Sequence, residues 1–127
     1  LTGAARIALG TELPALFTNN DELAQEVLRA GLAEEDPLWR MPLFQPYRRH
    51  LDSKVADINN IANIPQGGSI TAALFLQEFV HPKTTWLHID TMGWNSSSRA
   101  GRPAGGEVFG ARALYHVLRE RYGQSPQ

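Results

Sequence analysis

Three polar side chains around residue 85 are the first candidates for chemistry. His81 precedes a predicted strand that contains His88 and Asp90. The last two are two residues apart, so their side chains point to the same face of the strand. Imidazole and carboxylate groups are common metal ligands, but this spacing matches no known ligand signature. The alternative is that His88 and Asp90 are buried at the end of the strand and bonded to backbone, and we favour this structural interpretation.

Four other segments contain residue types that could take part in binding or catalysis. His50 and Asp52 could form an acid–base pair, but no third group is fixed near them, which favours a solvated helix end. The glycines at 67–68 precede a helix and could hold an anion, although a tight turn accounts for them better. The serines at 96–98 lack the context of a strained nucleophile turn and indicate a loop. Residues 91–95 follow a strand, where α/β sheets place ligand crevices, so they are the best pocket candidate.

Hydrophobic patterning predicts two strands and three main helices that would position these groups. The strands are Ala15–Thr18 and residues 85–90, and the helices cover residues 21–32, 70–80 and 107–122. Residues 47–51 predict a short helix, and the first ten residues predict either a short helix or a buried turn.

The ends and faces of these helices can also be predicted. Asn19 and Ser69 are the expected N-caps of the first two main helices. In the last helix, periodicity predicts a buried stripe that consists of Val108, Ala111, Leu114, Tyr115, Leu118 and Tyr122. The glycine-rich residues 93–106 are expected to form a loop.

These elements indicate the α/β class, in which helices flank a crossover between strands. The helix at residues 70–80 is apolar on nearly every side, so neighbouring structure must cover most of its surface. Two strands cannot cover such a helix, and an isolated strand pair is itself only marginally stable. We therefore expect further parts of the same protein, or a partner, to cover it.

The composition excludes several functional classes. The chain has 127 residues, which suits one domain, and its 12 basic and 13 acidic residues give a formal net charge of -1. This balance provides no electrostatic surface for nucleic acid or for an anionic membrane. The absence of cysteine excludes disulfides, thiolate zinc sites and a cysteine nucleophile, and it agrees with a cytoplasmic setting. No signal peptide is visible, and no stretch reaches the ~20 apolar residues that a bilayer span requires. The sequence opens without Met, so we expect a piece of a longer protein.

Four stretches resemble the C-terminal part of the catalytic domain of the leucyl (cytosol) aminopeptidase family. They read LTGA and ALG within residues 1–10, LWRMPL at 38–43, VADINNI at 55–61 followed by ITAALFLQEFV at 70–80, and WLHID at 86–90. Their order and approximate spacing match throughout, and the resemblance covers nearly all of residues 1–127. The WRMPL and ADINNI segments are the specific ones.

The resemblance implies a three-layer α/β/α catalytic domain, with few strands and three main helices in this portion. It also implies a metallo-exopeptidase that releases N-terminal residues from peptides, in which two divalent ions (Mn or Zn) activate a water molecule. In the family a lysine and an arginine stabilise the oxyanion, and the metal ligands include an NTDAEGR motif upstream of LTG. That motif is absent here. We therefore expect this portion to hold no metal and no catalytic residue, and to be inactive alone.

The residues carried over from the family are those on the substrate side. The LTG backbone contacts the substrate, the isoleucine of NNI lies in the side-chain pocket, and the segment after the last strand completes the wall. In this sequence the corresponding residues are Leu1, Thr2, Gly3, Ile61, Met92 and Asn95. Met92 stands where a small residue is usual, which should shrink or reshape the pocket. Ala62 also replaces a common glycine.

Two functional hypotheses follow. In the first, the chain is a C-terminal fragment of a dinuclear aminopeptidase and supplies pocket wall and scaffold. Its partners would be the peptide substrate, the upstream part of the same protein and the other subunits of a hexamer, which is the family's assembly. In the second, it is a stand-alone, non-catalytic interaction or peptide-binding module. An in-frame NTDAEGR stretch upstream of Leu1 would support the first hypothesis, and a start codon close to Leu1 would support the second.

Overall fold

A three-stranded sheet forms the centre of the molecule. The computed structural model describes residues 3–123, and residues 1–2 and 124–127 lie outside that range. The middle strand β1 (Ala15–Thr18) is parallel to β2 (Trp39–Arg40) and antiparallel to β3 (Leu87–Asp90). Both predicted strands are confirmed, although β3 begins at Leu87 rather than at residue 85. The sequence did not predict β2, because two residues show no period.

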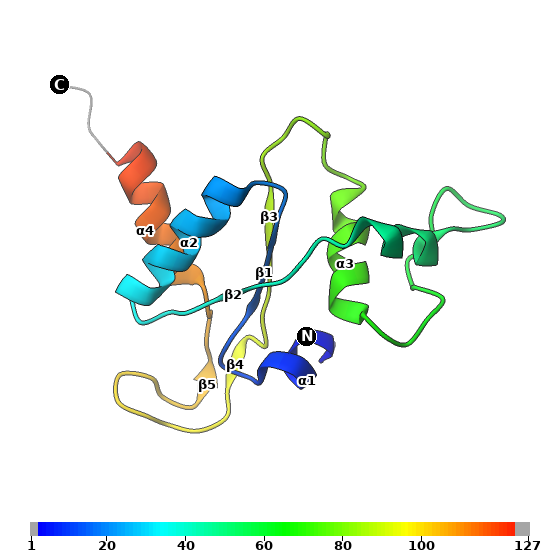
Figure 1. The fold of residues 1–127 in the computed structure, drawn as a ribbon. Helices are drawn as coiled ribbons and strands as arrows, with labels where there is room; N and C mark the ends of the chain where they lie inside the picture. Colours follow the sequence, from blue (N-terminus) through cyan, green and yellow to red (C-terminus); the bar gives the residue numbers. More distant parts are fainter. Residues whose placement is uncertain (1–2, 124–127) are drawn as a thin grey trace.

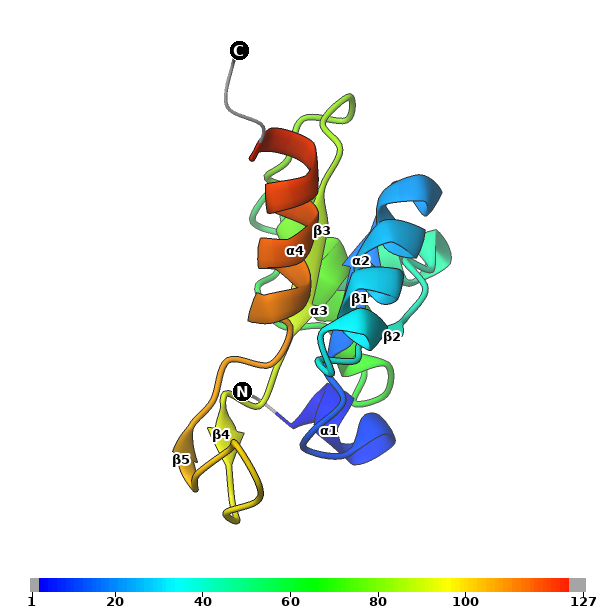
Figure 2. The same cartoon turned by 90° about the vertical axis from the view of Figure 1, so that its left-hand side faces the viewer.

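Helices cover both faces of this sheet. In Figures 1 and 2, α2 (Asp21–Ala33) and α4 (Ala111–Tyr122) lie on one face, and α3 (Gly68–Gln77) lies on the other with the 3₁₀ helix η1 (Gln45–Leu51). The short helix α1 (Ala4–Leu9) lies near one end of the sheet. The three layers confirm the α/β class.

The side chains of β1 alternate between two hydrophobic clusters. Leu16 packs with Val27 of α2 and Val117 of α4. Phe17 points the other way and packs with Ala73 of α3. A slip of one residue would exchange the two faces, so this alternation fixes the register of β1.

The helix α2 has a different N-cap from the predicted one. The side-chain oxygen of Asn20 accepts the backbone N–H of Leu23 at 2.8 Å, so the prediction of Asn19 is wrong by one position. Asn19 instead joins β1 to the segment before β3. Its amide nitrogen donates to the carbonyl of Thr84 at 2.8 Å, and its amide oxygen accepts the N–H of Trp86 at 2.9 Å.

The helix α3 also begins differently from the prediction. Its N-cap is Gly67, whose φ of 66° lies in the left-handed region that favours glycine, and this residue has no side chain to cap the helix. Ser69 is therefore not the cap: it lies in the first turn, and its hydroxyl donates to Asp90 at 3.3 Å. The helix ends at Gln77 rather than at residue 80.

The predicted buried stripe of the last helix is correct only for Leu114, which is partly buried and packs against the cluster formed by α2, α4 and β1. In α4 the buried residues are Ala113 and Val117, while Tyr115, Leu118 and Tyr122 are 65%, 55% and 72% exposed. Val108 precedes α4, which begins at Ala111, and is exposed as well. The small side chain of Ala113 lets α4 approach α2 closely, which decides the buried face against the larger apolar residues.

A carboxylate from another segment holds α4 in this orientation. Asp36, after α2, is 1% exposed. One of its oxygens accepts the backbone N–H of Gly110 at 2.9 Å, and the other accepts those of Arg112 at 3.0 Å and Ala113 at 3.3 Å. Asp36 therefore caps a helix whose own N-cap residue is a glycine.

The predicted loop at residues 93–106 contains a small hairpin. β4 (Trp94–Asn95) pairs antiparallel with β5 (Gly105–Gly106). The connection between these strands remains a loop, so the prediction is correct except for two very short strands.

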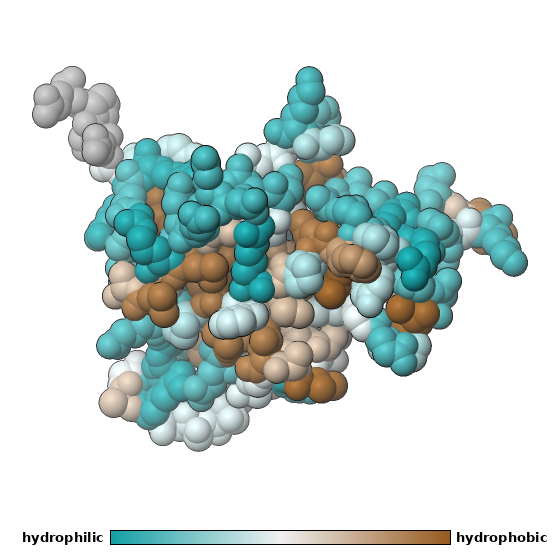
Figure 3. Space-filling model, viewed as in Figure 1, coloured by the Kyte–Doolittle hydropathy of each residue, from teal (hydrophilic) through white to brown (hydrophobic). Residues whose placement is uncertain are grey.

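Hydrophobic side chains remain on the surface over several elements. Ile7 of α1 is 88% exposed, and Phe79, which follows α3, is 71% exposed. Figure 3 shows hydrophobic residues gathered across the middle of one face, between more polar regions. Among the helices of residues 3–123, none is long and apolar enough to cross a membrane.

Candidate functional site

A cavity of about 600 Å³ lies between α1, α3 and the irregular segment that precedes α3. The apolar part of its lining comes from α1, α3 and the irregular segment, which contribute these side chains: Ile7, Ile61, Phe75 and Leu76. The lining also includes polar residues of the irregular segment, α3 and β3: Asn60, Thr71, His88 and Asp90. A mostly apolar hollow with a few polar groups is typical of a ligand site.

Gly3 lies at the edge of this cavity, and its backbone conformation explains why glycine is suited to the position. Its φ is 91°, which disfavours a side chain. A Cβ atom added here would lie 3.0 Å from a guanidinium nitrogen of Arg6. Nearby, a Cβ on Gly68 would lie 3.2 Å from that of Ala4, so α3 and α1 approach closely at the cavity wall.

His88 is held in the wall by two aromatic rings. Its ring stacks with Phe17 at 6.0 Å and with Trp86 at 6.2 Å between centroids. Burial lowers the pKa of His88 below its ordinary value, and the Asp90 carboxylate opposes that shift. The cavity therefore meets a neutral imidazole at neutral pH.

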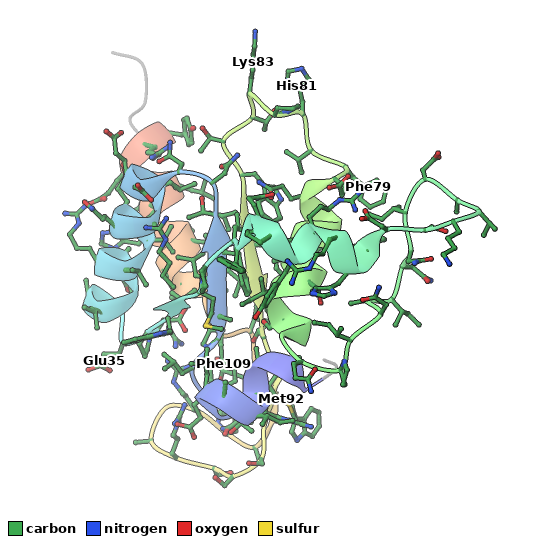
Figure 4. All side chains as sticks on the ribbon, turned by 45° about the vertical axis from the view of Figure 1, so that its right-hand side comes forward. Glu35, Phe79, His81, Lys83, Met92 and Phe109 are labelled. Atoms are coloured by element: carbon green, nitrogen blue, oxygen red, sulfur yellow. The ribbon has the colours of Figure 1, made fainter. Side chains whose placement is uncertain are left out.

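The three residues considered as a metal cluster do not come together. His81 lies in the loop before β3, at the end of the molecule opposite Met92, which follows β3 (Figure 4). The ring nitrogen Nδ1 of His81 accepts the N–H of Lys83 at 3.2 Å. Throughout residues 3–123, no group of three or more His, Asp or Glu side chains is arranged to hold a metal ion. This donor set does not fit a dinuclear centre.

The structure brings some of the predicted substrate residues together. Leu1 and Thr2 lie outside the described residues. Gly3 and Ile61, which are far apart in the sequence, line the same cavity. Met92 lies on the other side of Gly3, where both residues line a small cleft of about 10 Å³ with Arg6 and Asp90.

Asn95 lines neither the cavity nor the cleft. It is 3% exposed, and its amide nitrogen donates to the carbonyls of Arg102 at 3.1 Å and Pro103 at 2.9 Å. These bonds hold the loop between β4 and β5. Contact of Asn95 with substrate remains a prediction.

The other candidates from the sequence are separated or occupied. Nδ1 of His50 lies 2.9 Å from the side-chain oxygen of Asn63, whereas Asp52 accepts from Arg48 at 2.8 Å, so His50 and Asp52 are not bonded to each other. The hydroxyl of Ser98 accepts the N–H of Ala104 at 3.1 Å and so takes part in the loop.

The sequence analysis did not single out Arg6. Its Nη1 lies 3.3 Å from the sulfur of Met92, at the wall of the small cleft. The available signal was one arginine in an otherwise aliphatic helix, AARIAL.

Comparisons with known proteins agree with this arrangement. The model of the cytosol aminopeptidase family, catalytic domain, matches residues 1–115. A probable cytosol aminopeptidase of Synechococcus sp. (strain CC9605) is 48% identical over 116 residues, which are 90% of this chain and 24% of that protein. The chain thus spans about a quarter of the length of such relatives.

Two solved structures are similar as well. The cytosol aminopeptidase from Coxiella burnetii has a TM-score of 0.89 and 55% identity over 96% of this chain and 27% of its own. The bottromycin maturation enzyme BotP in complex with Mn has a TM-score of 0.84 and 41% identity, over 95% of this chain and 27% of its own. The chain belongs to the cytosol aminopeptidase family and is part of the family's catalytic domain.

Proposed function

We propose that this chain is the substrate-binding C-terminal portion of a metal-dependent aminopeptidase that releases N-terminal residues from peptides. The similarity to aminopeptidases over most of the chain supports the activity class. The related enzyme in complex with Mn supports a role for divalent ions, Mn or Zn, in the longer protein. Residues 3–123 contain no group of three or more His, Asp or Glu side chains arranged to hold a metal ion, so in this proposal the ions are held by the rest of that protein. A hexameric assembly and a cytoplasmic location are part of the same proposal.

The shared cavity of Gly3 and Ile61 carries this proposal. The resemblance assigns substrate contacts to both residues, and each comes from a different element. Ile61, Phe75 and Leu76 would exclude water from an apolar substrate side chain. The rigid wall formed by His88 and its two stacked rings would fix the position of that side chain.

The alternative of a stand-alone interaction or peptide-binding module is less well supported. The similarity to aminopeptidases continues through β3 and into α4, as the family match reaches residue 115. A chain retained only for interaction would not need to preserve both the cavity wall and the segment beyond it.

A chimera tests the proposal. In this chimera, residues 1–127 replace the corresponding quarter of the Coxiella burnetii cytosol aminopeptidase. We expect the chimera with Mn²⁺ or Zn²⁺ to hydrolyse leucine p-nitroanilide, and residues 1–127 alone not to do so. Ile61→Asp should reduce turnover in the chimera by about tenfold or more, because it places a charge in the apolar wall.

Val55→Asp is the matched control. Val55 lies in the same irregular segment, is 97% exposed and does not line the cavity. A folded chimera that contains metal but leaves the substrate intact would contradict the proposal. Turnover by residues 1–127 alone would contradict the assignment of the reacting groups to the rest of the protein.

A further inference from the structure

The imidazole of His88 has a fixed place in the wall of the large cavity. His88 lies in β3 and lines the cavity of about 600 Å³ that carries the proposed function. Its ring stacks with Phe17, which is fully buried in β1, and with Trp86, which packs on the same hydrophobic cluster as Phe17. Because both neighbours belong to the packed core, the position of the imidazole is set before a ligand binds.

The two ring nitrogens of His88 are available for hydrogen bonding. The other three histidines each use Nδ1: His50 with Asn63, His81 with Lys83, and His116 with Glu34. Within residues 3–123, neither ring nitrogen of His88 forms a hydrogen bond, and neither is among the buried side-chain atoms that lack a partner. Both nitrogens are therefore accessible, and the large cavity is the hollow that this residue lines.

The charge state of this imidazole favours a neutral polar ligand group. Burial lowers the pKa of His88, and the Asp90 carboxylate opposes that shift, so the ring is neutral at neutral pH. A neutral imidazole has one N–H donor and one acceptor nitrogen. A hydroxyl group can donate to the acceptor or accept from the donor, so either tautomer of His88 can bind it.

The rest of the lining indicates which ligand could present a hydroxyl group to His88. Ile61, Phe75 and Leu76 provide apolar surface from the irregular segment and from α3. A side chain with an aromatic body and one hydroxyl at its tip would bury the body against these residues and keep the hydroxyl for a polar partner. Tyrosine is the side chain with this composition.

We propose that His88 determines specificity for the first side chain of the substrate and favours tyrosine over phenylalanine through a hydrogen bond to the phenolic hydroxyl group. A site that is arranged to bind a hydroxyl disfavours the analogue without it, because its polar group then loses water and gains no partner. This inference rests on the proposed aminopeptidase function and names a substrate class for the same cavity: peptides that begin with Tyr.

The chimera allows a direct test with the p-nitroanilides of Tyr, Phe and Leu. His88→Phe keeps an aromatic ring for the stack and removes both nitrogens. In this variant the ratio of kcat/KM for Tyr to that for Phe should fall by about fivefold, as expected for the loss of one hydrogen bond. The ratio for Phe to Leu should stay close to that of the parent chimera, because neither side chain has a hydroxyl group. A merely structural role would change the values for Tyr and Phe by the same factor.

Two further variants serve as controls. His81→Phe makes the same replacement in the exposed loop before β3, outside the cavity, and should leave the Tyr to Phe ratio unchanged. Asn60→Ala removes another polar side chain of the cavity lining. A fall of the ratio in Asn60→Ala but not in His88→Phe would assign the hydroxyl to Asn60 and overturn the role of His88.

The remaining outcomes separate this inference from the proposed function. Hydrolysis of all three substrates with an unmoved Tyr to Phe ratio in His88→Phe would overturn the role of His88 and leave the proposed function intact. A parent chimera that does not prefer Tyr to Phe would have the same meaning. A folded parent chimera with metal that hydrolyses none of the three substrates would overturn both. The thermal midpoint of each variant shows whether it is folded.

Discussion

The carboxylate of Asp36 accepts the backbone N–H of Gly110 at 2.9 Å, although the two residues belong to segments that are distant in the sequence. This bond joins the end of α2 to the beginning of α4. It also supplies the capping group that Gly110 cannot supply, since glycine has no side chain. The orientation of α4 on the sheet therefore depends on a residue outside α4.

Replacement of Asp36 should destabilise the chain. Asp36→Ala leaves the N–H groups of Gly110, Arg112 and Ala113 without their acceptor, and we expect a loss of about 2–4 kcal/mol in the free energy of unfolding. Asp36→Asn keeps one acceptor oxygen and should cost less. Urea denaturation followed by tryptophan fluorescence measures both. Asp57→Asn, at an exposed loop position, is the control, and equal midpoints for Asp36→Ala and Asp57→Asn would refute the role of the cap.

His116 should make the packing of α2 on α4 dependent on pH. Its Nδ1 lies 2.6 Å from Glu34, and its Nε2 lies 3.2 Å from Glu120, which also pairs with Arg29. Only a protonated imidazole donates from both nitrogens. The hydrogen bond with Glu34 is the main cause that raises the pKa of His116, with Glu120 adding to it and burial opposing it.

The sign of this effect follows from the raised pKa. The stabilising contribution is complete below about pH 6.5, the value for an unfolded histidine, and is lost as pH rises through the higher pKa of the folded chain. We expect the urea midpoint to decrease over that interval, and His116→Gln to remove this part of the pH dependence. His81→Gln, in the exposed loop before β3, should leave it unchanged. A urea midpoint that rises with pH through the same interval in the parent chain would contradict this prediction.

Met92 should restrict the size of the first substrate side chain. Its sulfur is held against Arg6, so the side chain occupies a defined position in the wall. In the chimera, Met92→Ala should raise the ratio of kcat/KM for Phe to that for Ala p-nitroanilide severalfold, because it makes room for bulkier N-terminal residues. Val55→Ala is the control, because Val55 is 97% exposed and lines neither the cavity nor the cleft. An unchanged ratio across Ala, Leu and Phe substrates would contradict this prediction.

Asn95 allows a structural role to be separated from contact with substrate. Asn95→Asp removes the donor that binds the carbonyls of Arg102 and Pro103, so we expect a loss of about 1–3 kcal/mol in the free energy of unfolding. If the residue acts only through the loop, kcat/KM in the chimera should change by the same factor for Ala, Leu and Phe substrates. A selective change for one substrate would instead place Asn95 at the pocket.

The sequence predicted those elements whose structure depends mainly on residues that are neighbours in the chain. Ala15–Thr18 is a short apolar run that ends at two asparagines, and it forms β1. The alternation of Leu87 and Ile89 with His88 and Asp90 predicted the two faces of β3, and Leu87 and Ile89 indeed pack against the α2–α4 cluster. These patterns are informative because the hydrophobicity of successive residues indicates which side chains are buried.

The sequence could not predict features that depend on contacts between distant segments. The buried face of α4 is set by Asp36 and by the fit of Ala113 against α2, whereas periodicity alone favoured the larger residues such as Tyr115. The position of Arg6 on Met92 likewise requires the end of β3 to lie beside α1. For the candidate site, residue types and the family resemblance indicated Gly3 and Ile61, but only the fold shows that they share a cavity.

The exposure of Ile7 and Phe79 has a practical consequence for handling the molecule. Such side chains make isolated copies prone to self-association at high concentration. The same hydrophobic surface suits fragment complementation, in which two separately expressed pieces of the catalytic domain should reassemble in trans. Residues 1–127 would then be one half of a split-enzyme reporter.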